Sequence, residues 1–241
     1  MRAFGLFRKD ISIVRFFSCL LLLALGVGIS SGAAQSPAAP IESARSGAIT
    51  FTFDMPQIDP SHYVIVVDSG GHASYESHSQ DPDDPPYHIE FRVSDAGRDS
   101  LFAAARELNY FRGDFDYRKS KIAFTGTKKL EFASPEQQGS TTYNWSQDVR
   151  IQRVTQFFQN LSTTLEMGRH LSDLHKYDKL GMDAELKRME EMARTGDLTE
   201  LQVVAPVLEK IAADHTVINI ARRRAEAILA RVPSSSASER P

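Results

Sequence analysis

The chain has 241 residues, of which 41% are hydrophobic and 24% are charged, and its formal net charge at pH 7 is −3. These proportions are typical of a globular protein and exclude a disordered or fibrous chain. The slightly acidic balance also argues against nucleic-acid binding, which usually requires a basic surface.

The first segment has the three parts of a secretory signal peptide. Basic residues dominate positions 1–15, the uncharged run FFSCLLLLALGVGI spans 16–29, and small residues follow. This run is shorter than the about 20 residues that cross a membrane, so we predict cleavage near Ala34, with an uncleaved membrane anchor as the alternative. Cleavage would remove the single cysteine, Cys19, and would place the mature chain in the periplasm or outside the cell.

The remaining sequence changes character once, near residue 171, from mixed strand and helix to purely helical. The segments at its two ends, residues 35–47 and 233–241, are rich in small residues and proline and show no hydrophobic periodicity, which is typical of flexible segments. The predicted organisation is a signal peptide at 1–34, a flexible linker at 35–47, an α+β domain at 48–171, a helical C-terminal segment at 172–232 and a disordered tail at 233–241.

Seven strand-like runs occupy the mixed part. They are AITFTFDM, HYVIVVD, HASYES, YHIEFRVS, the two halves of KIAFTGTKKLEF, which could also form one strand, and TTYNWS. Amphipathic helices are predicted over 95–111, with Ser94 or Asp95 as the N-cap, and from Asp148 onward. The predicted fold class is α+β, a mostly antiparallel sheet with two helices packed on it and a helical segment after it.

The last part of the chain contains signals for several short helices. Asp183 is the expected N-cap of the first and Gly196 its C-terminal stop. The sequence DLTE at 197–200 has capping-box spacing, and Pro206 should kink or split the helix that follows. A final helix is predicted over about 216–231.

The main candidate site is the histidine- and aspartate-rich stretch from His62 to His88. A two-residue turn that includes Gly70 would place His62 and His72 on opposite faces of the sheet. Ligands of one zinc ion must each lie about 2 Å from the metal, which excludes this pair. His72 and His78 are separated by roughly 20 Å of strand, so they cannot bind one ion unless the chain turns back between them.

The loop SQDPDDPPY is the alternative site. Its candidate ligands are His78, Asp81, Asp83, Asp84 and His88. Three acids suit calcium, but the ligand spacing of an EF-hand is absent, and Pro82, Pro85 and Pro86 favour an extended polar connector. We therefore predict no catalytic, cofactor-binding or metal-ligating residue and keep the His78–His88 loop as the alternative.

The rest of the sequence gives weaker indications of a functional site. The G-x-S-x-G, H-E-x-x-H and Walker motifs are absent from the sequence, which removes the common signals for hydrolases and nucleotide-binding proteins. Trp145 beside Tyr143 is either a small binding patch or part of the core, and strand aromatics are more often core.

Over about residues 48–232, the chain resembles uncharacterised exported proteins of soil bacteria such as acidobacteria. The resemblance rests on the segments YVIVVDSGGHASYE, KIAFTGTKKLEF and YNWS and on the helix that contains Phe157 and Phe158. The resemblance implies export and supplies no activity, substrate or catalytic residue.

These observations predict an exported, non-catalytic protein that binds a protein or a cell-envelope component. No cofactor and no nucleic acid are expected, and the membrane would be contacted only through an uncleaved first segment. The alternative is a metal-dependent or hydrolytic enzyme that uses the His78–His88 loop.

Overall fold

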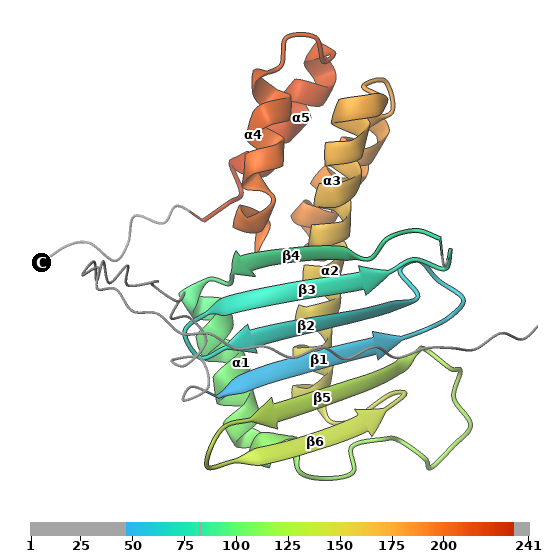
Figure 1. The fold of residues 1–241 in the computed structure, drawn as a ribbon, viewed down its shortest axis with the longest axis vertical. Helices are drawn as coiled ribbons and strands as arrows, with labels where there is room; N and C mark the ends of the chain where they lie inside the picture. The colour runs from blue at the N-terminus through green and yellow to red at the C-terminus, as the bar shows by residue number, and fades with distance from the viewer. Residues whose placement is uncertain (1–46, 82, 234–241) are drawn as a thin grey trace, which may run out of the picture. The chain divides into compact units, whose positions relative to one another are not determined.

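The computed structural model describes residues 47–81 and 83–233 (Figure 1). The predicted signal peptide, all of the linker except Gly47 and all of the tail except Pro233 lie outside the described residues. Within the described part, no helix is both long enough and apolar enough to span a membrane.

The described strands form one antiparallel sheet in the order β4-β3-β2-β1-β5-β6. They are β1 (Ala48–Asp54), β2 (His62–Asp68), β3 (His72–His78), β4 (Tyr87–Arg92), β5 (Thr127–Ala133) and β6 (Gln138–Tyr143). In the central strand β1, Ile49, Phe51 and Phe53 are buried while the residues between them are partly exposed. This period-two pattern is typical of a sheet with one covered face.

One expected strand is absent from the described residues. The run KIAFTGTKKLEF is a strand only over Thr127–Ala133, because Gly126 before it adopts a φ of +93° that breaks the extended backbone. Phe124, in the first half of this run, is 53% exposed. The last strand also begins at Gln138, earlier than the predicted run TTYNWS.

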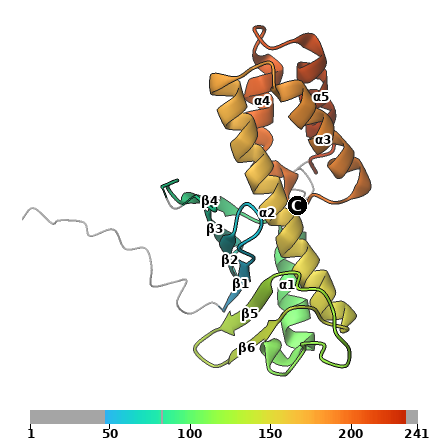
Figure 2. The ribbon, with the colours of Figure 1, turned by 90° about the vertical axis from the view of Figure 1, so that its right-hand side faces the viewer.

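The described α-helices are α1 (Asp95–Glu107), α2 (Val149–Tyr177), α3 (Met182–Thr195), α4 (Ala205–Ala213) and α5 (Asn219–Leu229). Helices α1 and α2 cover the same face of the sheet, as the two views show (Figures 1 and 2). The α+β architecture with a C-terminal helical segment predicted from the sequence is confirmed.

The two sheet-covering helices have the caps that their sequences suggest. Ser94 caps α1, accepting a hydrogen bond from the Gly97 N–H at 3.1 Å, and Asp148 caps α2 through the Arg150 N–H. Helix α1 ends before the predicted residue 111, because positions 109–111 all adopt positive φ angles.

The short helices follow the sequence signals less closely. Gly196 ends α3 in the left-handed conformation, as predicted, but Gly181 rather than Asp183 precedes its first turn. Pro206 lies in the first turn of α4, where a missing N–H costs nothing, so it starts that helix instead of kinking it. The final helix is also shorter than predicted, and its Ile220 is 50% exposed rather than buried.

The predicted capping box at 197–200 is wrong, and Glu200 has another role. Its carboxylate accepts hydrogen bonds from the Ser94 N–H at 2.6 Å and the Ser94 hydroxyl at 2.8 Å. Glu200 itself is 8% exposed and has a φ of +55°. The side chain therefore ties the helical segment to the start of α1 instead of capping its own helix.

Helix α2 contributes to two separate hydrophobic cores. Its residues up to Leu165 pack with the sheet and α1, whereas those from Met167 onward pack with α3, α4 and α5. The two cores therefore divide at Glu166, and the helix continues without a break through residue 171, where the sequence pattern changes.

Three buried tyrosines make the fold sensitive to alkali. Burial raises the pKa of Tyr63, Tyr75 and Tyr143 in the folded chain above the ordinary value of about 10. In the unfolded chain these phenols lose their protons above about pH 10, so rising pH favours unfolding. We predict that the free energy of unfolding falls above pH 10, by up to about 1.4 kcal/mol per pH unit for each tyrosine.

The measurement is chemical denaturation at pH 8 to 11.5, with phenolate absorbance followed alongside circular dichroism. The variant Tyr143→Phe should show a shallower decline. Ionisation of all seven tyrosines before any loss of circular dichroism would contradict the prediction.

Candidate functional site

No described helix covers the sheet face opposite α1 and α2 (Figures 1 and 2). We call it the open face. The strand alternation places eleven ionisable side chains on it: Asp54, His62, Asp68, His72, Glu76, His78, His88, Glu90, Arg92, Lys129 and Glu131.

All four candidate histidines lie on the open face, which corrects the expectation that His62 and His72 point to opposite sides. Strands β2 and β3 are joined by three residues, 69–71, not two. Gly71 accepts the φ of +82° that this turn requires. The extra residue changes the pairing by one position, so that His62 faces His78 directly.

His62 and His78 belong to a row of polar groups at one end of the open face. The Nδ1 atom of His62 lies 2.6 Å from Asp54 Oδ1, and His78 Nε2 lies 3.0 Å from Glu76 Oε1. Glu76 is paired across the strands with His88, whose Nδ1 lies 3.9 Å from Glu76 Oε2. These five residues come from β1, β2, β3 and β4, and we call them the histidine row.

His72 lies at the other end of the face and has a structural role. Its backbone N–H donates to Asp68 Oδ1 at 2.8 Å, and its ring contacts both Asp68 and Arg92. Arg92 also donates to the Gly70 carbonyl at 2.8 Å. These contacts close the β2–β3 turn.

The loop between His78 and His88 has the hydrogen bonds of a turn. The Asp83 N–H donates to Asp81 Oδ1 and the Asp81 N–H to Ser79 Oγ, both at 3.0 Å. All three of its aspartates are exposed. Across residues 47–81 and 83–233, no three His, Cys, Asp or Glu side chains already surround a point where a metal ion would bind.

The covered face contains a polar network that the sequence did not reveal. The Glu166 carboxylate accepts hydrogen bonds from the Tyr75 hydroxyl at 2.7 Å, the Ser77 hydroxyl at 2.6 Å and Arg169 Nε at 2.9 Å. The Tyr75 hydroxyl also lies 3.0 Å from Ser162 Oγ. No periodicity marks Glu166 in the sequence, because its partners Tyr75 and Ser77 come from a strand 89–91 residues away.

A cleft of about 520 Å³ borders this network, between the β1–β2 loop, α2 and α3. Five of its ionisable residues form ion pairs: Glu166 with Arg169, and Glu185 with His170 at 3.7 Å and with Arg188 at 3.9 Å. Asp59 and Asp173 also line the cleft. The pairing favours a stabilising role for the five paired residues over acid–base catalysis.

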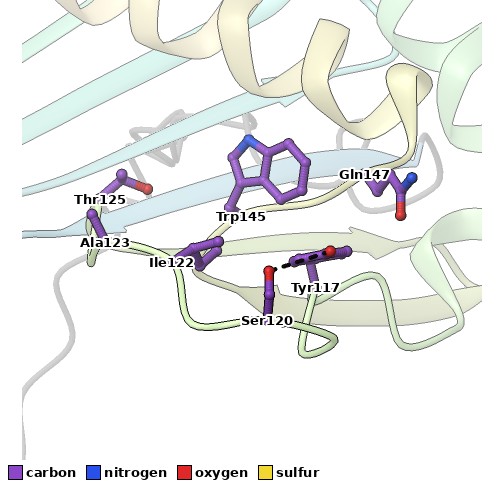
Figure 3. Close-up of a pocket in the computed structure, with 7 residues that line it drawn as sticks. All are labelled: Tyr117, Ser120, Ile122, Ala123, Thr125, Trp145 and Gln147. Carbon is purple, nitrogen blue, oxygen red and sulfur yellow. Dashed lines mark hydrogen bonds between the residues drawn. The ribbon is translucent and has the colours of Figure 1, made fainter.

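An apolar pocket of about 380 Å³ lies beside the β6–α2 connection (Figure 3). Tyr117 and Trp145 meet edge to face there with ring centres 5.2 Å apart, and Trp145 is 37% exposed. Tyr143, in contrast, is buried and contacts the Thr155 hydroxyl at 2.6 Å. Tyr143 is therefore a core residue, whereas Trp145 lines the pocket.

Lys128 is a buried cation near this pocket and was not identified from the sequence. Its Nζ donates to the carbonyls of Thr125, Gly126 and Asn144 at 2.8 to 2.9 Å. Burial lowers the pKa of Lys128 to about 8. Because its three donors are matched by carbonyl acceptors, Lys128 anchors the 119–126 segment to β5.

No protein-family model and no curated protein matches the chain. The functional argument therefore rests on the geometry of the open face and on the chemistry of its side chains.

The Glu166 network should matter for stability rather than for binding at the open face. We predict that Glu166→Ala lowers the free energy of unfolding by about 1–3 kcal/mol, because Tyr75 and Ser77 then lose a buried acceptor. Denaturant titration measures this change. The control, Glu90→Ala on the open face, should stay within about 0.5 kcal/mol of the parent, and an equal loss in both variants would refute the assignment.

Proposed function

We propose that the chain is an exported binding protein that acts without catalysis, and that its open face contacts a basic surface on a protein partner. The observation that carries this proposal is the sheet itself. Six strands are covered by helices on one face, while the other face leaves its side chains exposed or only partly buried.

The charges on the open face favour a basic partner. Five carboxylates, those of Asp54, Asp68, Glu76, Glu90 and Glu131, stand against only two bases. The bases are Arg92, which contacts His72, and Lys129, which is paired with Glu131 at 2.8 Å. Complementary charge guides partners to such a surface and selects among them.

The middle of the open face suits contact with a folded surface. Thr50, Thr52, Val64 and Val66 lie on the paired central strands β1 and β2, and all four are half-buried. Short β-branched side chains make a flat, weakly polar centre, and the charged residues lie around it. An apolar centre with a polar rim is the usual anatomy of a protein interface.

The test is photo-crosslinking in the native cell, with a photoreactive residue at Thr52 or Val64 and the control at the exposed Tyr177 of α2. We expect Thr52 and Val64, but not Tyr177, to form an adduct with one protein whose surface is basic, identified by mass spectrometry. Charge reversal in Glu76→Lys/Glu90→Lys should remove the adduct.

Three outcomes would overturn the proposal. They are an adduct of twice the chain mass, which indicates a second copy, a lipid adduct, or equal labelling from Tyr177. A circular dichroism melt of the charge-reversed variant separates loss of binding from loss of folding.

Export is tested separately by sequencing the N-terminus of the protein purified from its native cells. The basic, apolar and small-residue parts of the first segment support cleavage, so we expect the mature chain to begin at or near Gln35. A chain that still begins at Met1 would contradict this prediction while leaving the binding proposal standing.

A further inference from the structure

Two imidazoles in the histidine row have the spacing of ligands on a shared metal ion. His62 and His78 are direct cross-strand partners, and their ring centres lie 5.5 Å apart. Zinc–nitrogen bonds of about 2.0–2.1 Å in tetrahedral geometry place two ligating imidazoles with ring centres about 5 Å apart. The separation of the two rings is therefore compatible with two imidazoles that share one ion.

The neighbouring carboxylates strengthen this interpretation. Asp54 contacts Nδ1 of His62, and Glu76 contacts Nε2 of His78. In protein metal sites, a ligating histidine typically donates its second ring N–H to a carboxylate, which orients the ring and fixes its tautomer. The same arrangement here leaves Nε2 of His62 and Nδ1 of His78 as the nitrogens with a lone pair.

Further ligands are close to the pair. Glu76 lies between His78 and His88, and His88 is its direct partner on β4. The relevant side chains are 36% to 53% exposed, so they can reorient and water can complete the coordination. The described side chains hold no preassembled group of three ligands, so a third ligand would join when the ion binds.

We propose that His62 and His78 bind a divalent transition-metal ion of the zinc or copper class, with Asp54 orienting His62, Glu76 orienting His78, and His88 as the third ligand. Imidazole nitrogen suits these ions, whereas calcium and magnesium prefer a set of oxygen ligands. The proposal does not depend on the partner proposed for the open face.

The experiment uses the full chain without a polyhistidine tag, stripped with a chelator and titrated with zinc chloride in a calorimeter at pH 7.5. We expect one saturable site. His62→Ala and His78→Ala should each weaken binding at least tenfold, and Asp54→Asn should weaken it about 10–100-fold through the lost orientation of His62.

His72→Ala is the matched control, because His72 lies on the same face but at its other end, and it should leave zinc affinity unchanged. Zinc should also raise the melting temperature of the parent and of His72→Ala, but not of His62→Ala/His78→Ala. Calcium chloride should have no effect on any of them.

The proposal is overturned if zinc shows no saturable binding, or if His72→Ala weakens binding as much as His62→Ala does. All substituted side chains are on the surface, and circular dichroism of each variant confirms that a lost signal reflects lost ligands.

Discussion

Helix α2 is the element on which the rest of the structure depends. Phe158 on its first half stacks on Phe51 of the central strand with ring centres 5.0 Å apart and planes within 3° of parallel. Its second half supplies Met167 and Leu171 to the core of the helical segment. Glu166 lies between the two cores, where two hydroxyls and one guanidinium satisfy the hydrogen-bonding capacity of its carboxylate.

This packing leaves the sheet with two different faces. The helices take the buried aromatic and aliphatic face, so the charged and histidine-bearing face remains open. Strand pairing then gathers residues distant in sequence, such as Asp54, His62 and His88, into one row. Both the proposed partner surface and the proposed metal site are consequences of one-sided covering of the sheet.

Several features followed from local sequence pattern alone. Period-two alternation identified the strands that contain Phe51 and Ile89, the apolar run before the glycine turn identified the strand that contains Ile65, and helical periodicity identified α1 and α2. The Gly196 stop was also found, and Ser94 was one of two N-cap candidates, because caps and stops depend on side-chain and backbone preferences within one turn. The segment that contains Phe124 was misassigned, since its hydrophobic residues imitate a strand but Gly126 interrupts the backbone.

The sequence by itself determined the fold class, the start of α1 at Ser94 or Asp95 and the residue types available on each strand, because these depend on interactions between near neighbours. Only the tertiary structure decided which face each histidine occupies, since one extra residue in the turn at Gly71 reverses the alternation. It also decided the roles of Glu166, Glu200 and Lys128. Each of them has a hydrogen-bond partner distant in the sequence, Tyr75 for Glu166, Ser94 for Glu200 and Asn144 for Lys128, and no local pattern in the chain encodes such contacts.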